Sequence, residues 1–217
     1  ISDISHQLKT PLAALMMYQE IVASELEHPD TVQKFVGKMG VSLQRMEQLI
    51  QSMLKITRLD SGSIVFERQD ILVTELIDRA VRDLQTRAGQ EGKGIQLKGD
   101  TAEHLSCDAE WTVEALGNLV KNALDHTATG GHIRIVWSRT PAMLQIQVSD
   151  NGSGIAPEDI HHIFKRFYRS RHSLDAPGIG LGLPLAKSII EGQGGVITVQ
   201  SVEGEGATFT VSFLTKL

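Results

Sequence analysis

The chain has 217 residues, of which 41% are hydrophobic and 22% are charged, a balance that is typical of a globular protein and excludes a disordered chain. Its net charge of −5 gives no reason to expect binding to nucleic acid or to anionic lipid, so any bound anion must meet a local site. The single cysteine, Cys107, excludes an internal disulfide and agrees with a reducing compartment.

The first predicted helix runs from Ile1 to about Glu27 and carries a histidine on its solvent face. Its apolar residues follow a heptad pattern: Ile1, Leu8, Leu15 and Val22, with Ile4, Leu12, Tyr18 and Leu26 beside them. His6 lies farthest from this seam, where an unperturbed imidazole is largely neutral and nucleophilic at pH 7. Thr10 follows one turn later on the same face, and Pro11 removes a backbone donor inside the helix. An exposed histidine can also be a solvated residue without a role.

A second helix follows the break at His28-Pro29-Asp30. Its apolar residues alternate spacings of four and three: Val32, Val36, Met39, Leu43, Met46, Ile50 and Met53. Two such helices predict a hairpin whose own core is too narrow to bury both stripes. We therefore expect a homodimer that forms a four-helix bundle, and the alternative is a hairpin that lies against the rest of the same chain.

No apolar run approaches the roughly 18 residues that cross a bilayer, and no signal peptide precedes the first helix. We therefore expect the chain shown to be cytosolic, without contact with a membrane. The apolar repeat is already in register at Ile1 and has no helix cap before it, which predicts a longer natural chain upstream.

A change of pattern after Leu59-Asp60-Ser61-Gly62-Ser63 divides the chain into a helical hairpin, residues 1–61, and a second domain, residues 62–217. The second domain is predicted to contain, in order, a strand Ile64 to Glu67, a helix Val73 to Arg87, a strand Ile95 to Lys98, a helix from the Asp108 cap to about Asp125, antiparallel strands His132 to Ser138 and Met143 to Ser149, a helix Leu183 to Gln193, and a hairpin of Val196 to Val202 with Thr208 to Phe213. The expected fold class is α+β: the hairpin, then an α/β sandwich with a mixed sheet.

Three polar side chains, Asn118, Asn122 and His126, recur every four residues and so line one face of their predicted helix. Asparagine is a poor residue for the middle of a helix, and two on one stripe indicate a polar ligand. Plain surface positions would also accommodate them.

Two glycine-rich turns flank a basic and aromatic segment. Asp150-Asn151-Gly152-Ser153-Gly154 follows an apolar strand, where the carboxylate can accept a hydrogen bond from an exocyclic amine and the glycines let a ligand approach the backbone. Gly178 to Gly182 opens a helix, whose exposed N–H groups favour phosphate. Between them, Phe164 to Arg171 interleaves four cations with three aromatics, which could anchor the segment while arginines reach a phosphate. Each turn alone could be an ordinary loop.

Together these motifs resemble the catalytic core of bacterial two-component sensor histidine kinases. The resemblance rests on five segments in the family's order, which cover essentially the whole chain: His6 to Pro11, Asn118 to Ala123, Asp150 to Gly154, Phe164 to Arg169 and Gly178 to Gly182.

The resemblance implies that ATP phosphorylates His6 and that the phosphoryl group then passes to an aspartate of a response regulator, with Thr10 assisting dephosphorylation of that partner. It implies catalytic roles for His6, Gln7, Thr10 and Asn118. It implies Mg²⁺ coordination by Asn122, and ATP binding by Asn122, His126, Asp150, Gly152, Gly154, Arg169, Gly178, Gly180 and Gly182. A lid would span about Arg169 to Pro177, and the full-length protein would be a homodimeric, membrane-anchored sensor.

Two positions depart from the family's pattern. Gln7 follows the histidine where the family usually has Glu or Asp, and an amide cannot act as a carboxylate base. Asp125 stands where many members carry Lys, so that Lys121 or the lid arginines would supply the positive charge.

The second domain also resembles the wider ATPase superfamily that includes gyrase, the mismatch-repair ATPases and the Hsp90 chaperones. An ATP-hydrolysing conformational switch is therefore an alternative function. Those ATPases place Glu four residues before the magnesium asparagine, whereas this chain has Asn118, which cannot take a proton from water. A degenerate kinase kept as a dimeric scaffold is the other alternative, and the presence of all five motifs argues against it.

Overall fold

The computed structural model describes residues 2–170 and 178–214, with side chains from residue 5 onward. The chain divides into two compact units, residues 1–55 and residues 56–217. The sequence places the domain boundary slightly later, between residues 61 and 62, and that boundary stays a proposal. Within the described ranges, no helix is both long and apolar enough to span a bilayer.

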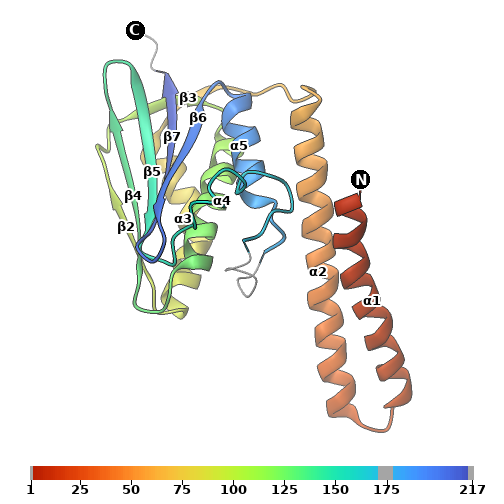
Figure 1. The fold of residues 1–217 in the computed structure, drawn as a ribbon. Coiled ribbons are helices and arrows are strands. Elements are labelled where there is room, and N and C mark those ends of the chain that lie inside the picture. Colours follow the sequence, from red (N-terminus) through yellow and green to blue (C-terminus); the bar gives the residue numbers. More distant parts are fainter. Residues whose placement is uncertain (1, 171–177, 215–217) are drawn as a thin grey trace. The chain divides into compact units, whose positions relative to one another are not determined.

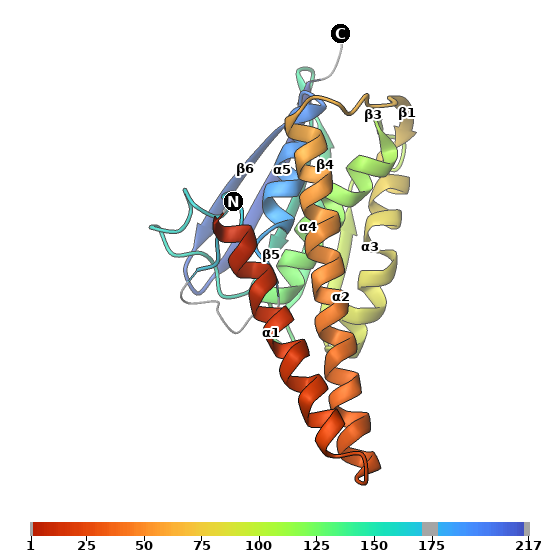
Figure 2. The ribbon, with the colours of Figure 1, turned by 90° about the vertical axis from the view of Figure 1, so that its right-hand side faces the viewer.

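The first unit is a hairpin of two antiparallel helices, as predicted: α1 (Ser2–Ser24) and α2 (Pro29–Asp60), which lie side by side in both views (Figures 1 and 2). The Tyr18 and Phe35 rings join them, with centroids 5.6 Å apart. α1 ends at Ser24 rather than near Glu27, and the Ser24 hydroxyl donates to the carbonyl of Ile21 at 3.0 Å. Pro29 then begins α2 at a position where its missing N–H costs nothing.

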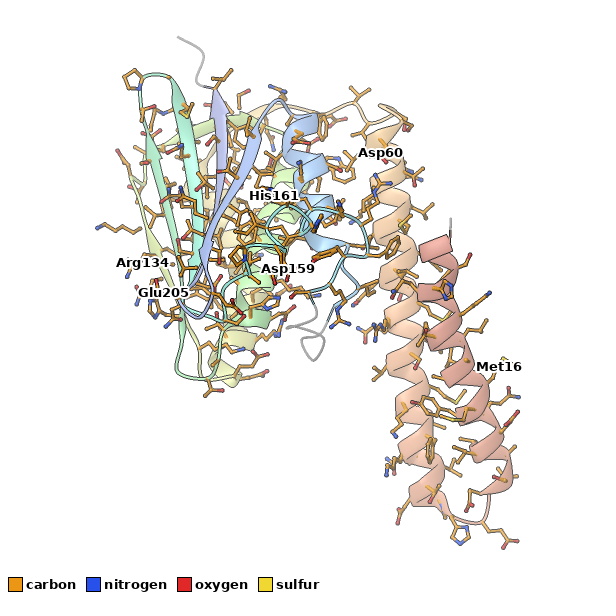
Figure 3. All side chains as sticks on the ribbon, in the orientation of Figure 1. Met16, Asp60, Arg134, Asp159, His161 and Glu205 are labelled. Carbon is orange, nitrogen blue, oxygen red and sulfur yellow. The ribbon has the colours of Figure 1, made fainter. Side chains whose placement is uncertain are left out.

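The predicted apolar seam of α2 is only half covered. Every second seam residue is half-buried: Val32, Met39, Met46 and Met53. The alternate residues are exposed, Val36 by 52%, Leu43 by 56% and Ile50 by 46%. Met16, which projects from α1 in Figure 3, is 59% exposed as well. The hairpin therefore leaves an apolar stripe without cover, as an incomplete helical bundle does.

The second unit is an α/β sandwich with a mixed sheet, and this confirms the predicted fold class. Its elements are β1 (Gln69–Leu72), α3 (Val73–Gln90), β2 (Gly94–Lys98), β3 (His104–Cys107), α4 (Ala109–His126), β4 (His132–Arg139), β5 (Met143–Asp150), α5 (Gly182–Gly192), β6 (Val196–Val202) and β7 (Gly206–Leu214). Five strands form one sheet in the order β2-β4-β5-β7-β6, in which β2 pairs with β4 in parallel and the other three neighbouring pairs are antiparallel. Figure 1 shows α3, α4 and α5 on one face of this sheet.

The core lies between the sheet and the three helices. Alternate residues of the central strands point into it, for example Ile135, Val148 and Phe209, which are opposite one another across β4, β5 and β7. Leu119 and Val120 of α4 are fully buried against this layer. This packing fixes the position of α4 relative to the sheet, and it therefore also fixes the position of the residues on the opposite face of the helix.

The strand predicted over residues 64–67 does not form, and β1 lies at Gln69–Leu72 instead. The N–H of Glu67 donates to the Asp108 carboxylate at 2.9 Å, and the Phe66 ring packs edge-on against Trp111. These contacts replace a strand ladder. β1 pairs with β3, a short strand that the sequence analysis missed although Leu105 and Cys107 alternate with polar residues.

Candidate functional site

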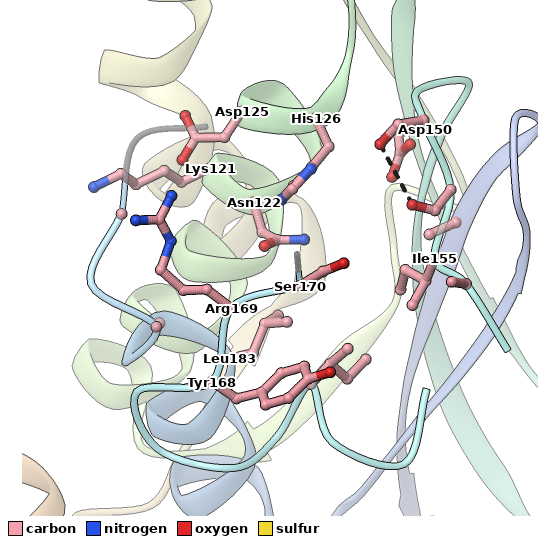
Figure 4. A pocket seen from close by; sticks show the side chains of 18 of the residues that line it. Lys121, Asn122, Asp125, His126, Asp150, Ile155, Tyr168, Arg169, Ser170 and Leu183 are labelled. Atoms are coloured by element: carbon pink, nitrogen blue, oxygen red, sulfur yellow. Dashed lines mark hydrogen bonds between the residues drawn. The ribbon is translucent and has the colours of Figure 1, made fainter. Parts of the chain in front are cut away.

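A cavity of about 240 Å³ opens between α4, the end of β5 and the start of α5. Figure 4 shows Asn122 and His126 projecting from α4 toward it, with Asp150 and Ile155 on the opposite side. It brings together most of the residues proposed to bind nucleotide, Asn122, His126, Asp150, Gly154, Arg169, Gly178, Gly180 and Gly182, and it is also lined by Asn118, to which a catalytic role was assigned. Gly152 is not among the described lining residues, so its contact with nucleotide stays a proposal.

The polar face of α4 forms one wall. The helix begins at the Asp108 cap, as predicted, and the Asp108 carboxylate accepts from the N–H of Trp111 at 3.2 Å. Asn118 donates from its Nδ2 to the carbonyl of Glu114 at 3.0 Å, so its amide is held in one orientation. Its Oδ1 lies 3.0 Å from the point where a Cβ on Gly182 would stand. Glycine at the start of α5 therefore leaves this amide oxygen open to the cavity.

Asp150 forms the opposite wall, at the last position of β5. Burial raises the pKa of its carboxyl group, and N–H groups of Gly152 and Ala207 and the nearby His126 oppose that shift. The Gly152 N–H lies 2.9 Å from Oδ1. A Cβ on Gly152 would stand 2.2 Å from the carbonyl oxygen of His126, so only glycine fits there. Gly152 thus holds the Asp150 turn close to the end of α4.

The basic and aromatic segment, residues 164–170, is anchored by its aromatic rings as predicted. Phe164 packs edge-on against the core residue Phe209, with centroids 6.3 Å apart. The Tyr168 hydroxyl is hydrogen-bonded to the Asp159 carboxylate. The N–H of Phe167 donates to the carbonyl of Gly180 at 2.8 Å, which joins this segment to the second glycine turn. Arg169 follows directly and lines the cavity, while the proposed lid beyond Ser170 lies outside the described residues until Gly178.

A charge pair lies at the edge of the cavity. The Arg87 guanidinium donates to the Asp125 carboxylate at 2.7 Å and to Glu91 at 2.6 Å. Asp125 lines the cavity with only 8% of its side chain exposed. The acid that departs from the family's pattern is therefore neutralised from α3, and Lys121 and Arg169 add positive charge to the lining.

The other candidate residues lie in the first unit. His6 is exposed, as its position on the helical wheel predicts, and Gln7 is half-buried. The Thr10 hydroxyl donates to the main-chain carbonyl of His6 at 3.3 Å. The imidazole is therefore presented to solvent with a hydroxyl one turn away.

Sequence reasoning missed several apolar and small residues of the cavity: Ser153, Ile155, Ala156, Ile163, Leu183 and Ala207. They come from three separate segments, and only the fold brings them together. The sequence gives little indication of their role, since an isoleucine after a glycine-rich turn is ordinarily predicted to be a buried core residue. An apolar lining with a few polar groups is nevertheless what a planar base requires.

Two family descriptions match the chain. Residues 107–217 match "Histidine kinase-, DNA gyrase B-, and HSP90-like ATPase", and residues 1–62 match "His Kinase A (phospho-acceptor) domain". Together they cover all five motifs on which the resemblance rests, and residues 63–106 lie outside both matches.

Curated relatives are similar over nearly the whole chain. A sensor-like histidine kinase, SenX3, of Mycobacterium tuberculosis is 30% identical over 98% of this chain and 52% of its own length. The sensor protein kinase PmrB of Pseudomonas aeruginosa is 32% identical over 99% and 45%, and the sensor histidine kinase WalK of Bacillus subtilis is 29% identical over 97% and 35%. The chain thus spans about half the length of these relatives or less.

Solved structures share the fold. The Acinetobacter baumannii histidine kinase AdeS superposes with a TM-score of 0.79 at 18% identity, over 98% of both chains. A histidine kinase, ThkA, in complex with the response regulator protein TrrA gives 0.82 at 21% identity, over 99% of this chain and 60% of that one. Full-length ShkA in complex with AMPPNP gives 0.75 at 20% identity, over 100% and 46%.

Proposed function

The chain belongs to the sensor histidine kinases, and from that premise we propose that it transfers the γ-phosphoryl group of ATP to His6 and then to an aspartate of a response regulator. The observation that carries the proposal is the cavity of the second unit. One face of α4 and the Asp150 turn meet there with the second glycine turn, while His6 stands exposed on a helix of the other unit.

We assign the base of the nucleotide to the Asp150 side of the cavity. A carboxylate can accept a hydrogen bond from the exocyclic amine of adenine, whereas guanine presents a carbonyl at the corresponding position and would be repelled. Ile155 and Leu183 offer apolar surface to the ring. His126 faces the same space from α4 (Figure 4).

We assign the phosphates to the other end of the cavity, where Arg169, Lys121 and the glycine turn at the start of α5 offer positive charge and backbone N–H groups. The amide oxygens of Asn122 and Asn118 fit Mg²⁺, which prefers oxygen ligands. When bound, Mg²⁺ would neutralise charge on the phosphates.

Transfer to the protein needs a nucleophile on the protein, and it competes with hydrolysis whenever a water molecule beside the γ-phosphate is activated. A neutral imidazole nitrogen of His6 forms the new bond to phosphorus, the bond from phosphorus to the bridging oxygen breaks, and ADP leaves with that electron pair. The imidazole proton passes to water, because the amide of Gln7 cannot accept it. Asn118 stands where a hydrolase would carry a base, so the phosphoryl group is protected from attack by water.

We further propose that the active species is a homodimer, because the exposed seam residues Val36, Leu43 and Ile50 would complete a bundle core with a second copy. In the same proposal, the Thr10 hydroxyl orients the water that removes phosphate from the regulator.

The test is a product balance with γ-labelled ATP and Mg²⁺. We expect one ADP for each labelled protein chain, with a label that is labile to acid and stable to base, as phosphohistidine is. Release of inorganic phosphate without labelled protein would instead support the ATP-hydrolysing switch, and neither product would support the scaffold.

A further inference from the structure

Residues 63–68 lie between α2 and β1 within the second unit, and the last three of them contact the ends of two of its helices. We call this segment the linker. The Phe66 ring packs against Trp111 with centroids 6.3 Å apart and lies so close to Gly192 that a Cβ there would stand 3.0 Å from it. The linker therefore contacts the start of α4 and the end of α5 at the same time.

Polar contacts reach the same two helix ends. The N–H of Glu67 donates to Oδ2 of Asp108 at 2.9 Å, while the other oxygen of Asp108 caps α4. The Arg68 guanidinium donates to the main-chain carbonyl of Gln193, the residue that ends α5. A cation at this carbonyl satisfies an acceptor that the helix cannot pair and complements the negative end of its dipole.

Gln193 joins the two helix ends directly. Its side chain is 2% exposed, and both of its polar atoms are paired. Oε1 accepts from the N–H of Asp108 at 2.7 Å, and Nε2 donates to the Thr112 hydroxyl at 3.1 Å. A buried carboxamide whose oxygen and nitrogen both have hydrogen-bond partners tolerates few alternative arrangements, so the register of α4 against α5 is fixed at this point.

The opposite ends of the same two helices carry the nucleotide site. Asn118 and Asn122 lie on the later turns of α4, and Gly182 begins α5. Asn118 and Gly182 are in close approach, as the 3.0 Å separation from a hypothetical Cβ shows. Since a helix transmits displacement along its axis, a change at the Gln193 end alters this approach.

We propose that Gln193 and Arg68 are positioning residues. They bind the linker to the start of α4 and the end of α5. These contacts hold both helices in the register that the nucleotide site at their other ends requires. Displacement of the linker then changes nucleotide affinity, although no linker residue lines the cavity among those described. This inference rests on the proposed function only in taking the cavity to bind ATP.

The test compares Arg68→Met, which keeps the aliphatic stem and removes the donor, with Arg68→Lys, which keeps a donor for a single carbonyl. We expect Arg68→Met to raise the Kd for ATP about two- to tenfold and Arg68→Lys to restore most of it. Amide resonances of Asn118, Asn122 and Gly182 should shift in Arg68→Met and return in Arg68→Lys. Arg134→Met is the matched control, because Arg134 is exposed on β4, and it should change neither readout.

Gln193→Met is the second variant, with thermal unfolding as the check that it folds. The same shifts of the distant amides should appear in it. A lower melting temperature with an unchanged Kd for ATP, and amide resonance shifts confined to residues near 68, 108 and 193, would overturn the proposal. The contacts of Arg68 and Gln193 would then have a purely structural role. If the wild-type chain bound no ATP, the proposed function would fail, while the amide shifts would still decide whether these contacts act on the site.

Discussion

Arg87 of α3 and Asp125 of α4 form an ion pair at the edge of the nucleotide cavity, with 2.7 Å between Nη2 and Oδ1. The pair places an acid beside the expected phosphates and neutralises it from a different helix. Removal of the Arg87 cation should therefore change the affinity of the cavity for ATP.

Arg87→Met leaves the Asp125 carboxylate without its cation beside the phosphates. We expect ATP binding to weaken by about 1–2 kcal/mol, less than the roughly 3–5 kcal/mol of a broken buried pair, because charges here are partly solvated. Isothermal titration calorimetry measures this loss. In the double variant with Asp125→Asn the affinity should recover, and a loss that persists there would show that Arg87 acts on the phosphates independently of Asp125.

Asp150→Asn replaces the carboxylate that is proposed to accept a hydrogen bond from adenine with an amide. The Gly152 N–H already donates to Oδ1 of this side chain, so the asparagine oxygen would keep that bond. The asparagine NH₂ group would then face the exocyclic NH₂ group of adenine, and two donors would be opposed. We expect ATP affinity to fall by roughly 2–3 kcal/mol, about 30- to 150-fold. The loss for GTP should be small. Equal losses for both nucleotides would contradict the assignment of the base to this side of the cavity.

The same variant tests the pKa of Asp150. Burial raises the folded-state pKa above the ordinary value of 3.8, so between these two values the folded chain binds more protons than the unfolded chain. This contribution to stability falls as pH rises through the window. The gain in unfolding free energy from Asp150→Asn should therefore be larger at neutral pH than at pH near 4, as denaturant titrations at the two values would record. A gain independent of pH would contradict the shift.

Thr10→Ala removes a hydroxyl that donates a hydrogen bond to the main-chain carbonyl of His6. The fold and the labelling of His6 should persist, while dephosphorylation of the regulator should slow about a hundredfold, the low end for loss of a group positioned for proton transfer. Thr10→Ser is the control that keeps the hydroxyl. Unchanged dephosphorylation in Thr10→Ala would end the proposed role of this residue.

Leu43→Glu combined with Ile50→Glu places two charges in the exposed seam of α2, where a second copy would bury them. Sedimentation should then change from dimer to monomer. Val41→Glu is a matched control, because Val41 is 68% exposed but lies outside the seam. If the double variant remained dimeric, the dimer would use another surface.

Local patterns predicted the helices well, since periodicity and capping are properties of neighbouring residues. Asp108 was recognised as a cap from its place before an apolar run, and His6 as exposed from its place on the wheel. The polar face of α4 followed from the spacing of Asn118, Asn122 and His126 in the same way.

Long-range contacts decided what the sequence could not predict. The N–H of Glu67 pairs with Asp108, 41 residues later, and that bond replaces the predicted strand. Arg87 neutralises Asp125 across 38 residues, and no local rule connects them. Ile155 and Leu183 meet in the cavity only because β5 and α5 flank α4.

The central claim is that the phosphoryl group of ATP bound in the second unit reaches His6. Mass spectrometry of the protein after incubation with ATP and Mg²⁺, handled at neutral or basic pH, locates the modified residue most directly. We expect phosphate on the peptide that contains His6, and none in His6→Gln or in Asn122→Ala. Phosphate on another residue, or label that persists in His6→Gln, would contradict the account.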